Sequence, residues 1–391
     1  MRRCWLHTVF FLALNVLSLQ VISPVPGEPA STPSIILNNV RYWPASDYTR
    51  IVLDLSNPTT YTDKYLPDPD RLYINLENTF IVGSIPSVDI ENGLVKQVRA
   101  AQNDKQTVRV VVDLTGKANY KIFLLTSPDR LVVDIYKEVS DKQVPHSPPQ
   151  KSSAAKTPTI VIDPGHGGKD PGAIGKKGLK EKDIVLDVGI RLKRLIKDKI
   201  GADVVMTRET DIFIPLEERT AIANKKDADL FISIHANSSR REGASGAETY
   251  LLGRATNREA MDTAMRENSA TEKSLNELQL ILTDLLTTVK KDESLRLAHY
   301  VQGNLIENLE PDYKINNLGV KQAPFYVLVN ARMPSILAEI SFISNREEEQ
   351  RLGKSKYRQE IAEAILDGII KYIQSTSSLA YPKEAANISA R

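Results

Sequence analysis

Residues 160–168 read IVIDPGHGG, an apolar run of strand length that ends in a glycine-rich turn containing a histidine. A second run, FISIHAN at residues 231–237, also places a histidine directly after a strand pattern. Continuous apolar runs of this length are typical of strands buried on both faces of a parallel sheet. Because the carboxyl ends of parallel strands line the ligand crevice of open sheets, we expect His166 and His235 to converge there.

The sequence around these two runs alternates between strand and helix patterns. Strand-like runs occupy residues 159–163, 202–208, 230–235, 247–252, 325–329 and 336–340, and helical periodicity covers residues 181–199 and 351–375. Strands that alternate with helices are typical of a sheet built from βαβ units. We therefore predict an α/β catalytic domain over residues 158–375, with a mostly parallel sheet and flanking helices.

A repeat with a constant offset of 59 residues lies in the first half of the chain. The stretch RIVLDL at residues 50–55 recurs as RVVVDL at residues 109–114, and the tripeptide at residues 70–72 recurs at residues 129–131. Both copies are rich in β-branched residues and are bounded by turn residues. Chance similarity between strands is the alternative, but it does not explain identities at one offset. The repeat predicts a small pseudo-symmetric all-β sandwich over residues 34–137.

Residues 138–157 separate these two regions and are rich in Lys, Ser and Pro. This composition cannot build a core and is typical of an extended linker. Residues 376–391 follow the last helical pattern and are expected to form a tail.

Composition excludes several classes of protein. The 391 residues include 51 Lys and Arg against 49 Asp and Glu, and the resulting net charge of +2 argues against a nucleic-acid-binding protein. The hydrophobic share of 41% is that of an ordinary folded chain. The single cysteine, Cys4, excludes an intrachain disulfide and a metal site made of thiolates.

Residues 1–27 have the pattern of a secretory signal peptide. Arg2 and Arg3 precede a mostly apolar stretch at residues 5–22, and a proline-rich segment follows. An uncleaved anchor is the alternative interpretation, although polar residues interrupt a stretch that is short for a membrane span. The arginine pair also matches a twin-arginine signal loosely. Because any basic start supplies two arginines, we favour the Sec route. We expect a periplasmic protein with no stable membrane span after processing.

Two carboxylates join the histidines as candidate site residues. Glu181 opens the predicted helix after the glycine-rich loop, where the helix macrodipole alone would favour an acidic residue. Glu339 lies within the apolar run at residues 336–340, where a carboxylate is costly to bury unless it is paired or used. Two imidazoles, one carboxylate and an open position match a catalytic zinc site, and the second carboxylate is available as a base.

Competing catalytic motifs are absent from the sequence. The glycine-rich stretch at residues 165–178 lacks the G-x-x-x-x-G-K-[ST] spacing of a phosphate-binding loop. No G-x-S-x-G elbow occurs, so a serine hydrolase has little support.

Several short motifs resemble, in family order, those of the zinc-dependent N-acetylmuramoyl-L-alanine amidases of the amidase_3 type. The motifs are DPGHGG at residues 163–168, Glu181-Lys182, Thr207-Arg208, Arg219 with Ala223-Asn224, SIHAN at residues 233–237, and Glu339 with FISN at residues 342–345. The resemblance covers about residues 158–373. The 59-residue repeat in turn resembles the AMIN domain, a peptidoglycan-targeting β-sandwich.

The resemblance implies a role for each matching residue. His166, Glu181 and His235 would hold Zn²⁺, and Glu339 would be the catalytic carboxylate. The substrate would be peptidoglycan, cleaved at the amide between the lactyl group of N-acetylmuramic acid and L-alanine of the stem peptide. Asp163 and Asn237 are candidates for residues that support the ligands from behind, although both are also ordinary turn residues at strand ends.

The segment between His235 and Glu339 is long, and its excess lies around residues 260–300. Leucines at helical spacing in this insert predict a helix that either packs in the core or regulates the site. The sequence Arg266-Glu267-Asn268 resembles a segment of division-associated amidases in which a carboxylate of the insert completes the zinc shell. Glu267 is therefore the candidate for an autoinhibitory zinc contact. This resemblance also implies a degenerate metallopeptidase-like activator of the division machinery, which would favour the open state.

The leading hypothesis is an amidase that remodels the cell wall during daughter-cell separation. A non-catalytic wall-binding or regulatory protein on the same fold is the first alternative, and the presence of all four site residues argues against it. A zinc amidase with a different substrate is the second alternative.

Overall fold

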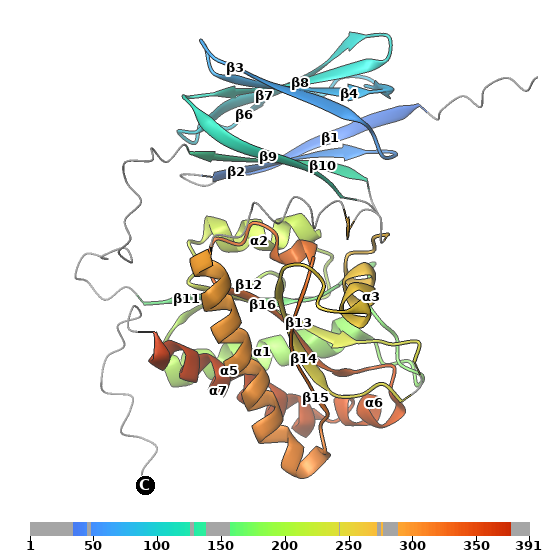
Figure 1. Cartoon of the computed structure of the whole chain (residues 1–391), viewed down its shortest axis with the longest axis vertical. Helices are drawn as coiled ribbons and strands as arrows, with labels where there is room; N and C mark the ends of the chain where they lie inside the picture. Colours follow the sequence, from blue (N-terminus) through green and yellow to red (C-terminus); the bar gives the residue numbers. More distant parts are fainter. Residues whose placement is uncertain are drawn as a thin grey trace, which may run out of the picture. The chain divides into compact units, whose positions relative to one another are not determined.

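The computed structural model describes residues 34–44, 48–125, 129–137, 157–241, 243–271, 275–276 and 288–376 (Figure 1). The expected signal peptide, almost all of the linker, most of the tail and the centre of the insert lie outside the described residues. Among the described residues, no helix has both the length and the apolar character that crossing a membrane requires.

The first half of the chain forms two packed β-sheets, as the repeat predicts. One sheet has the strand order β5-β1-β2-β10-β9, and the other has the order β3-β4-β8-β7-β6 (Figure 1). The strands are β1 (Ile35–Pro44), β2 (Tyr48–Leu55), β3 (Tyr61–Leu66), β4 (Arg71–Glu77), β5 (Thr79–Phe80), β6 (Val88–Asp89), β7 (Val95–Asp104), β8 (Thr107–Leu114), β9 (Ala118–Leu125) and β10 (Arg130–Lys137). Alternate residues such as Leu72, Ile74, Val110 and Val112 fill the core between the sheets.

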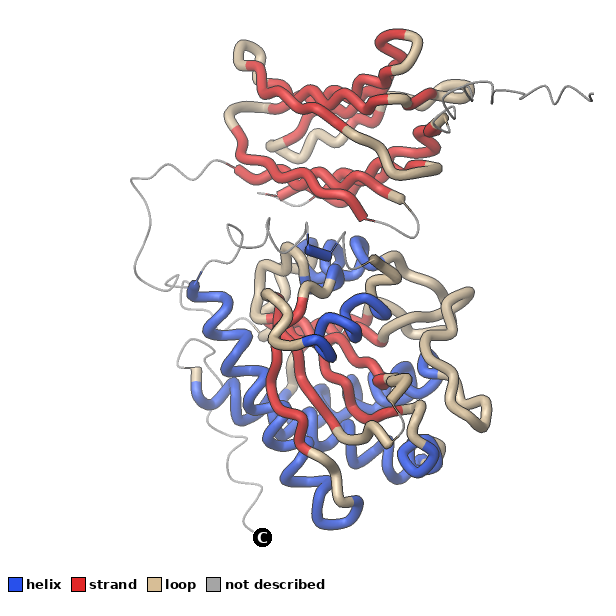
Figure 2. Tube along the Cα trace, turned by 45° about the vertical axis from the view of Figure 1, so that its right-hand side comes forward, coloured by secondary structure: helices blue, strands red, loops and turns tan. Residues whose placement is uncertain are grey.

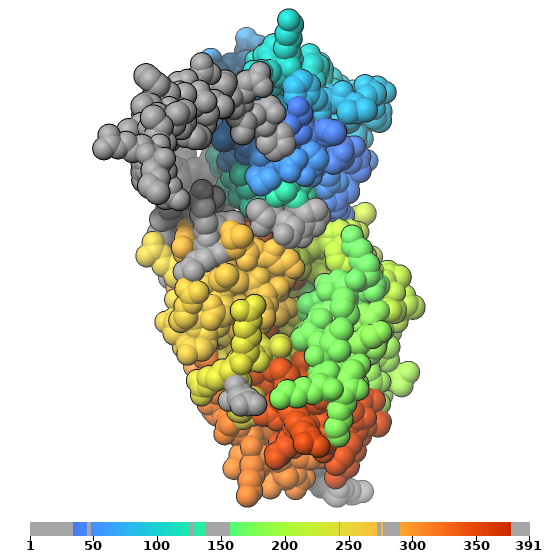
Figure 3. All heavy atoms as spheres, turned by 90° about the vertical axis from the view of Figure 1, so that its right-hand side faces the viewer, coloured from blue at the N-terminus to red at the C-terminus, as the bar shows by residue number. Residues whose placement is uncertain are grey.

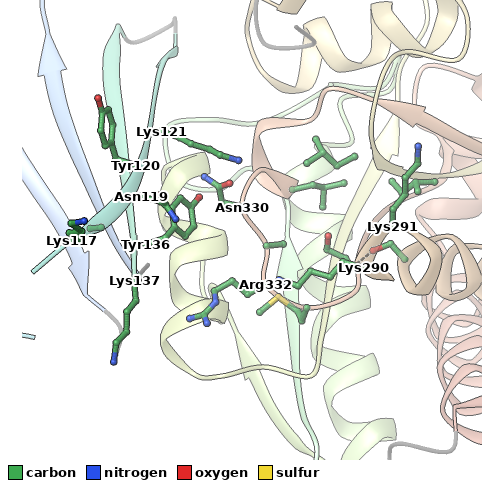
Figure 4. A pocket seen from close by; sticks show the side chains of 18 of the residues that line it. Lys117, Asn119, Tyr120, Lys121, Tyr136, Lys137, Lys290, Lys291, Asn330 and Arg332 are labelled. Carbon is green, nitrogen blue, oxygen red and sulfur yellow. Dashed lines mark hydrogen bonds between the residues drawn. The ribbon is translucent and has the colours of Figure 1, made fainter. Parts of the chain in front are cut away.

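The two repeat copies exchange strands between the sheets. Strand β10 of the second copy pairs with β2 of the first, and β4 of the first copy pairs with β8 of the second. Each sheet therefore contains strands of both copies, which joins the copies into one core. Figure 4 shows part of the first sheet, in which Asn119 and Lys121 of β9 lie on the same side as Tyr136 of β10.

The second half of the chain forms a six-stranded sheet in the order β12-β11-β13-β16-β14-β15. Every adjacent pair is parallel except β14 with β16, so the prediction of a mostly parallel sheet is confirmed. The strands are β11 (Thr159–Pro164), β12 (Asp203–Met206), β13 (Leu230–Asn237), β14 (Ala247–Leu252), β15 (Asn317–Ala323) and β16 (Ser335–Phe342).

Helices cover both faces of this sheet (Figures 1 and 2). Ile160 and Ile162 point to one face, where they pack on α1 (Glu181–Ile200), α5 (Thr288–Tyr313) and α7 (Ser355–Ser375). Val161 and Phe231 point to the other face, which carries the shorter elements. These are α2 (Leu216–Lys225), α3 (Arg258–Glu267) and the 3₁₀ turn η1 (Tyr326–Leu328); α6 (Arg346–Leu352) precedes α7.

Two element predictions are wrong in this region. Residues 325–329 form the turn η1, in which Leu328 N donates to Phe325 O at 3.0 Å, because a short buried apolar run does not by itself distinguish a strand from a turn. The single helix predicted over residues 351–375 is two helices, since Lys354 has extended backbone between α6 and α7. The elements α2 and β15 were not predicted.

Candidate metal centre

The site lies where β11, β13 and α1 meet at the carboxyl edge of the sheet. His166 follows β11 and has φ of 58°, and His235 lies near the end of β13. Glu181 is the first residue of α1. The loop that follows β11 needs glycine at position 165, because a Cβ atom on Gly165 would lie 2.4 Å from Cε1 of His235.

Four side chains converge at this edge. His166, Glu181, His235 and Glu267 each offer one ligand atom, and these atoms all lie within 4.8 Å of one another. Nε2 of His166 is 3.1 Å from Oε1 of Glu181 and 3.1 Å from Oε2 of Glu267. Nδ1 of His235 is 3.2 Å from the same oxygen of Glu181 and 2.9 Å from that of Glu267.

The geometry of this cluster fits a cation better than a hydrogen-bonded network. Nε2 of His166 and Oε2 of Glu267 are buried, yet neither makes a hydrogen bond of acceptable geometry despite their short separation. Lone pairs that point at a common centre are the arrangement that a metal ion requires. Two imidazoles with carboxylates are also the donor set of catalytic zinc sites.

The charges of the four groups support the same interpretation. Burial by itself raises the pKa of Glu267, as does the nearby Glu181 carboxylate, but the facing histidines lower it to about 2. Burial lowers the pKa of His235, whereas the negative charge of Glu267 and a hydrogen bond to Glu181 raise it to about 10. Positive charge on the histidines therefore balances the two ionised carboxylates in the metal-free cluster, and a bound cation would take over this role.

Glu339 lies beside this cluster on β16, directly opposite His235 in the strand register. Its side chain is fully buried, and neither carboxylate oxygen has a hydrogen-bond partner among the described residues. Burial and the negative charge of Glu267 raise the pKa of Glu339 well above its usual value. A buried carboxyl group without a partner is costly, so its presence here points to a reacting group or ligand that completes it.

Comparison with known proteins decides the family. The sequence profile described as N-acetylmuramoyl-L-alanine amidase matches residues 160–371, which is more than half of the chain. The chain belongs to this amidase family. The AMIN domain profile matches residues 39–135, so the chain carries an AMIN domain before its amidase domain.

Two relatives match the chain over most of their own length. The chain is 34% identical over 380 residues to the N-acetylmuramoyl-L-alanine amidase AmiC of Escherichia coli O6:H1, covering 87% of this chain and 90% of that protein. It is 32% identical over 405 residues to AmiC of Neisseria meningitidis serogroup B, covering 92% and 95%. The solved structure of AmiC2 of Nostoc punctiforme is 34% identical with a TM-score of 0.44, covering 56% of this chain and 99% of that one.

Asp170 supports the amidase site and was not predicted. Its Oδ2 atom lies 2.8 Å from Nδ1 of His166, and its Oδ1 atom accepts a hydrogen bond from Gly172 N at 3.0 Å. A carboxylate on the outer nitrogen fixes the ring so that Nε2 faces the centre. The only signal in the sequence is its position four residues after His166 in the glycine-rich loop.

Asp163 stabilises the backbone of the same loop and not the side chain of a candidate metal ligand. Its buried carboxylate accepts hydrogen bonds from Thr207 Oγ1 at 2.6 Å, from Ser233 Oγ at 2.8 Å and from Arg219 Nη1 at 2.8 Å. Arg219 also donates to the carbonyl oxygens of Pro164 and His166, each at 2.8 Å. Burial raises the pKa of Asp163, but the Arg219 charge and these hydrogen bonds lower it below its usual value.

Asn237 contacts the insert. Its side-chain oxygen accepts a hydrogen bond from Arg266 Nη2 at 2.9 Å, and its side-chain nitrogen donates to Glu248 Oε1 at 2.6 Å. On the far side of Glu267, Asn268 donates to Pro324 O at 2.8 Å and accepts from Tyr326 N at 2.9 Å. Both neighbours of Glu267 are thus anchored, which holds its carboxylate in the cluster.

The segments that build the site share one face of the amidase domain. Figure 3 shows the loop after β11 in green, the loop after β13 in yellow and the region of α3 in gold on this face. Helix α3, the described start of the insert, thus lies on the same face as the two loops that carry His166 and His235.

Proposed function

We propose that this chain is a zinc-dependent N-acetylmuramoyl-L-alanine amidase. Its substrate would be peptidoglycan, cleaved at the amide between the lactyl group of N-acetylmuramic acid and L-alanine of the stem peptide. The observation that carries the proposal is the convergence of His166, Glu181 and His235 beside the unpartnered carboxyl group of Glu339, within a domain of this family.

His166, Glu181 and His235 would hold the zinc ion. When bound there, zinc lowers the pKa of a water molecule toward 7 and polarises the carbonyl oxygen of the scissile amide. Asp170 holds the ring of His166 in place, and Arg219 with Asp163 holds the backbone of the loop that carries it.

Glu339 performs the proton transfers in this mechanism. Its carboxylate takes a proton from the attacking water and later donates it to the amine nitrogen of L-alanine as the carbon–nitrogen bond breaks. The pKa of a base for this task should lie near the operating pH, and full burial raises the pKa of Glu339 in that direction. The negative charge of Glu267 raises this pKa further.

Glu267 supports a resting state that is autoinhibited. Its carboxylate occupies the side of the cluster where a substrate carbonyl and water would bind, and it is held there by the anchors of Arg266 and Asn268. Activity would then require α3 to move, and a degenerate metallopeptidase-like activator of the division machinery would favour the moved state.

The segments outside the catalytic domain would determine where the protein acts. Residues 1–27 would direct export to the periplasm by the Sec route, and the AMIN domain within residues 34–137 would target the wall. Residues 138–157 would serve as the linker to the catalytic domain at residues 158–375. The biological role would be cell wall remodelling during daughter-cell separation.

Digestion of purified sacculi, followed by mass spectrometry of the products and zinc analysis of the protein, tests the activity. We expect free stem peptides that begin with L-alanine. Release of disaccharides or cleavage within the stem peptide would contradict the assignment. Absence of any product, even after removal of the Glu267 carboxylate, would favour a non-catalytic wall-binding protein.

A further inference from the structure

The outward face of the β3-β4-β8-β7 sheet presents a group of cations around one aromatic ring. On β4, Leu72, Ile74 and Leu76 point into the sandwich core, so Arg71, Tyr73 and Asn75 point outward. The strand register places Arg109 of β8 opposite Asn75 and Lys64 of β3 opposite Tyr73. In Figure 1 this sheet is the layer of the sandwich that carries the labels β3, β4, β7 and β8.

Tyr73 lies between two guanidinium groups. The Cζ atoms of Arg71 and Arg109 lie 5.6 Å and 5.4 Å from the centroid of its ring, within the range of a cation–π contact. Nε of Arg109 donates to the neutral side-chain oxygen of Asn75 at 2.8 Å. Nε of Arg71 is buried and has no hydrogen-bond partner among the described residues. In the part of the chain that the structure describes, no carboxylate forms an ion pair with Arg71, Arg109 or Lys64.

The repeat supplies an internal comparison for this face. At the offset of 59 residues, Arg109 corresponds to Arg50 and Asn75 corresponds to Asp134. In the other sheet Asp134 accepts hydrogen bonds from Arg50 Nε at 2.7 Å and from Arg50 Nη2 at 2.9 Å, so the guanidinium charge is neutralised within the sandwich. Asn75 accepts the equivalent hydrogen bond from Nε of Arg109. Because the amide of Asn75 is neutral, it does not balance the charge of the Arg109 guanidinium group.

We propose that this face binds carboxylate groups of peptidoglycan stem peptides through Arg71 and Arg109, with the ring of Tyr73 as an apolar contact between them. A guanidinium group pairs with a carboxylate through two parallel hydrogen bonds, and a neutral Asn75 leaves Arg109 available for such a pair. The complementarity of charge favours stem peptides, which carry free carboxylates. The inference rests on peptidoglycan as the proposed substrate and does not involve the metal centre.

The decisive variant is Asn75→Asp, because it rebuilds the neutralised pair of the other sheet with almost no change in side-chain size. We expect retention on purified sacculi to fall about fivefold to tenfold, the scale of the net contribution of one hydrogen bond. Arg109→Ala should lower retention to a similar extent. Cosedimentation of the processed full chain measures both effects, in a Glu339→Gln background that leaves the sacculi intact.

Lys105→Ala is the matched control. Lys105 lies exposed in the turn between β7 and β8, and its loss changes the net charge by the same amount as Asn75→Asp. We expect less than a twofold change in retention for this control. Sacculi whose carboxylates have been converted to amides should bind the parent chain as weakly as native sacculi bind the Asn75→Asp variant.

Two results would overturn the inference. One is parent-like retention of both Asn75→Asp and Arg109→Ala, and the other is an equal loss for Lys105→Ala, which would indicate an effect of bulk charge. Circular dichroism and thermal unfolding establish that each variant is folded. Failure of the proposed activity is distinguishable, because turnover of a soluble muropeptide by the chain with Glu339 intact is measured separately. If the parent chain releases no product but the Asn75→Asp variant is retained less, the binding inference holds and the proposed enzymatic activity is wrong.

Discussion

At the scale of single residues, Glu339 is the clearest case of a buried carboxyl group that its surroundings do not stabilise. It is fully buried in β16, and neither of its oxygens has a hydrogen-bond partner among the described residues, whereas Asp163, another buried carboxylate of the amidase domain, accepts three hydrogen bonds. A protein does not gain stability from an unpaired buried carboxyl group. This contrast between Glu339 and Asp163 is the one expected if Glu339 is the reacting residue of the proposed function and Asp163 a supporting one.

Replacement of Glu339 by glutamine tests this distinction. We expect turnover of peptidoglycan to fall about 10²-fold to 10⁴-fold, because an amide cannot accept the proton of water. The zinc content, measured by atomic emission, should stay the same, since Glu339 is not among the ligand atoms of the cluster. A variant that retains activity, or one that loses its metal, would contradict the assigned role.

Replacement of Asp163 by asparagine should act on stability instead. Arg219 is 2% exposed, so removal of its partner's charge leaves a buried guanidinium unpaired, which costs about 3–5 kcal/mol of unfolding free energy at pH 7. The folded-state pKa of Asp163 is lowered, so its contribution is present above the unfolded pKa of about 3.9 and is lost as the pH falls through the folded-state value.

Urea unfolding at pH 7 and at pH 3 measures this difference, which should shrink at the lower pH. The control is Asp113→Asn, which disrupts the ion pair with Arg99, a residue that is 49% exposed. An exposed pair contributes about 0–1 kcal/mol. Equal destabilisation by the two variants would show that the buried ion pair contributes no more to the free energy of unfolding than the exposed one.

At the scale of elements, the position of α3 places Glu267 in the cluster. Asn257 caps its first turn by accepting from Ala260 N at 2.9 Å, and Arg266 and Asn268 anchor its last turn. The helix is short, with ten residues, so its position depends on these anchors more than on its own helical propensity. A partner that competes for them would release Glu267.

Replacement of Glu267 by alanine should therefore raise the activity of the isolated chain. The expected increase is tenfold or more, since one carboxylate no longer competes with substrate for the open position. Glu259→Ala is the matched control, because Glu259 lies on the same helix and is exposed. Dye release from labelled sacculi measures both variants. Unchanged or lower activity in a folded Glu267→Ala variant would refute autoinhibition.

The elements also show which sequence patterns were reliable. The strand predicted over residues 247–252 has those bounds in the structure, and the helix predicted from Glu181 begins there. These segments combine strong periodicity with clear ends. The strand β15 was missed because Gly319, with φ of 78°, and several polar residues interrupt its pattern. The turn η1 was mistaken for a strand because all its residues are buried and apolar.

At the scale of the whole molecule, the metal centre links folding to function. Two ionised carboxylates, Glu181 and Glu267, share one buried site, and their repulsion is relieved by positive charge between them. An ion that binds only the folded chain stabilises it by mass action. In the proposed function the same ion completes the catalytic site, so stability and activity should be lost and regained together.

Removal of the metal with a chelator should lower the thermal unfolding temperature of the amidase domain by several degrees, at about 2–4 °C per kcal/mol for a domain of this size. Activity on sacculi should disappear in parallel. Zn²⁺ should restore both, whereas Mg²⁺ should not, because imidazole ligands suit zinc and magnesium prefers oxygen. An unfolding temperature that does not respond to chelator would argue against a structural linkage.

The sequence by itself determined the two domains, the mostly parallel sheet and the residue types at its carboxyl edge. These follow from local periodicity, a repeat at fixed offset and the order of motifs, all of which are written along the chain. Only the tertiary structure decided that Asp170 supports His166, that Asn237 holds Arg266, and that Asn75 stands where Asp134 stands in the other sheet. The reason is physical: these roles depend on side-chain directions and on contacts between separate segments, which periodicity does not encode.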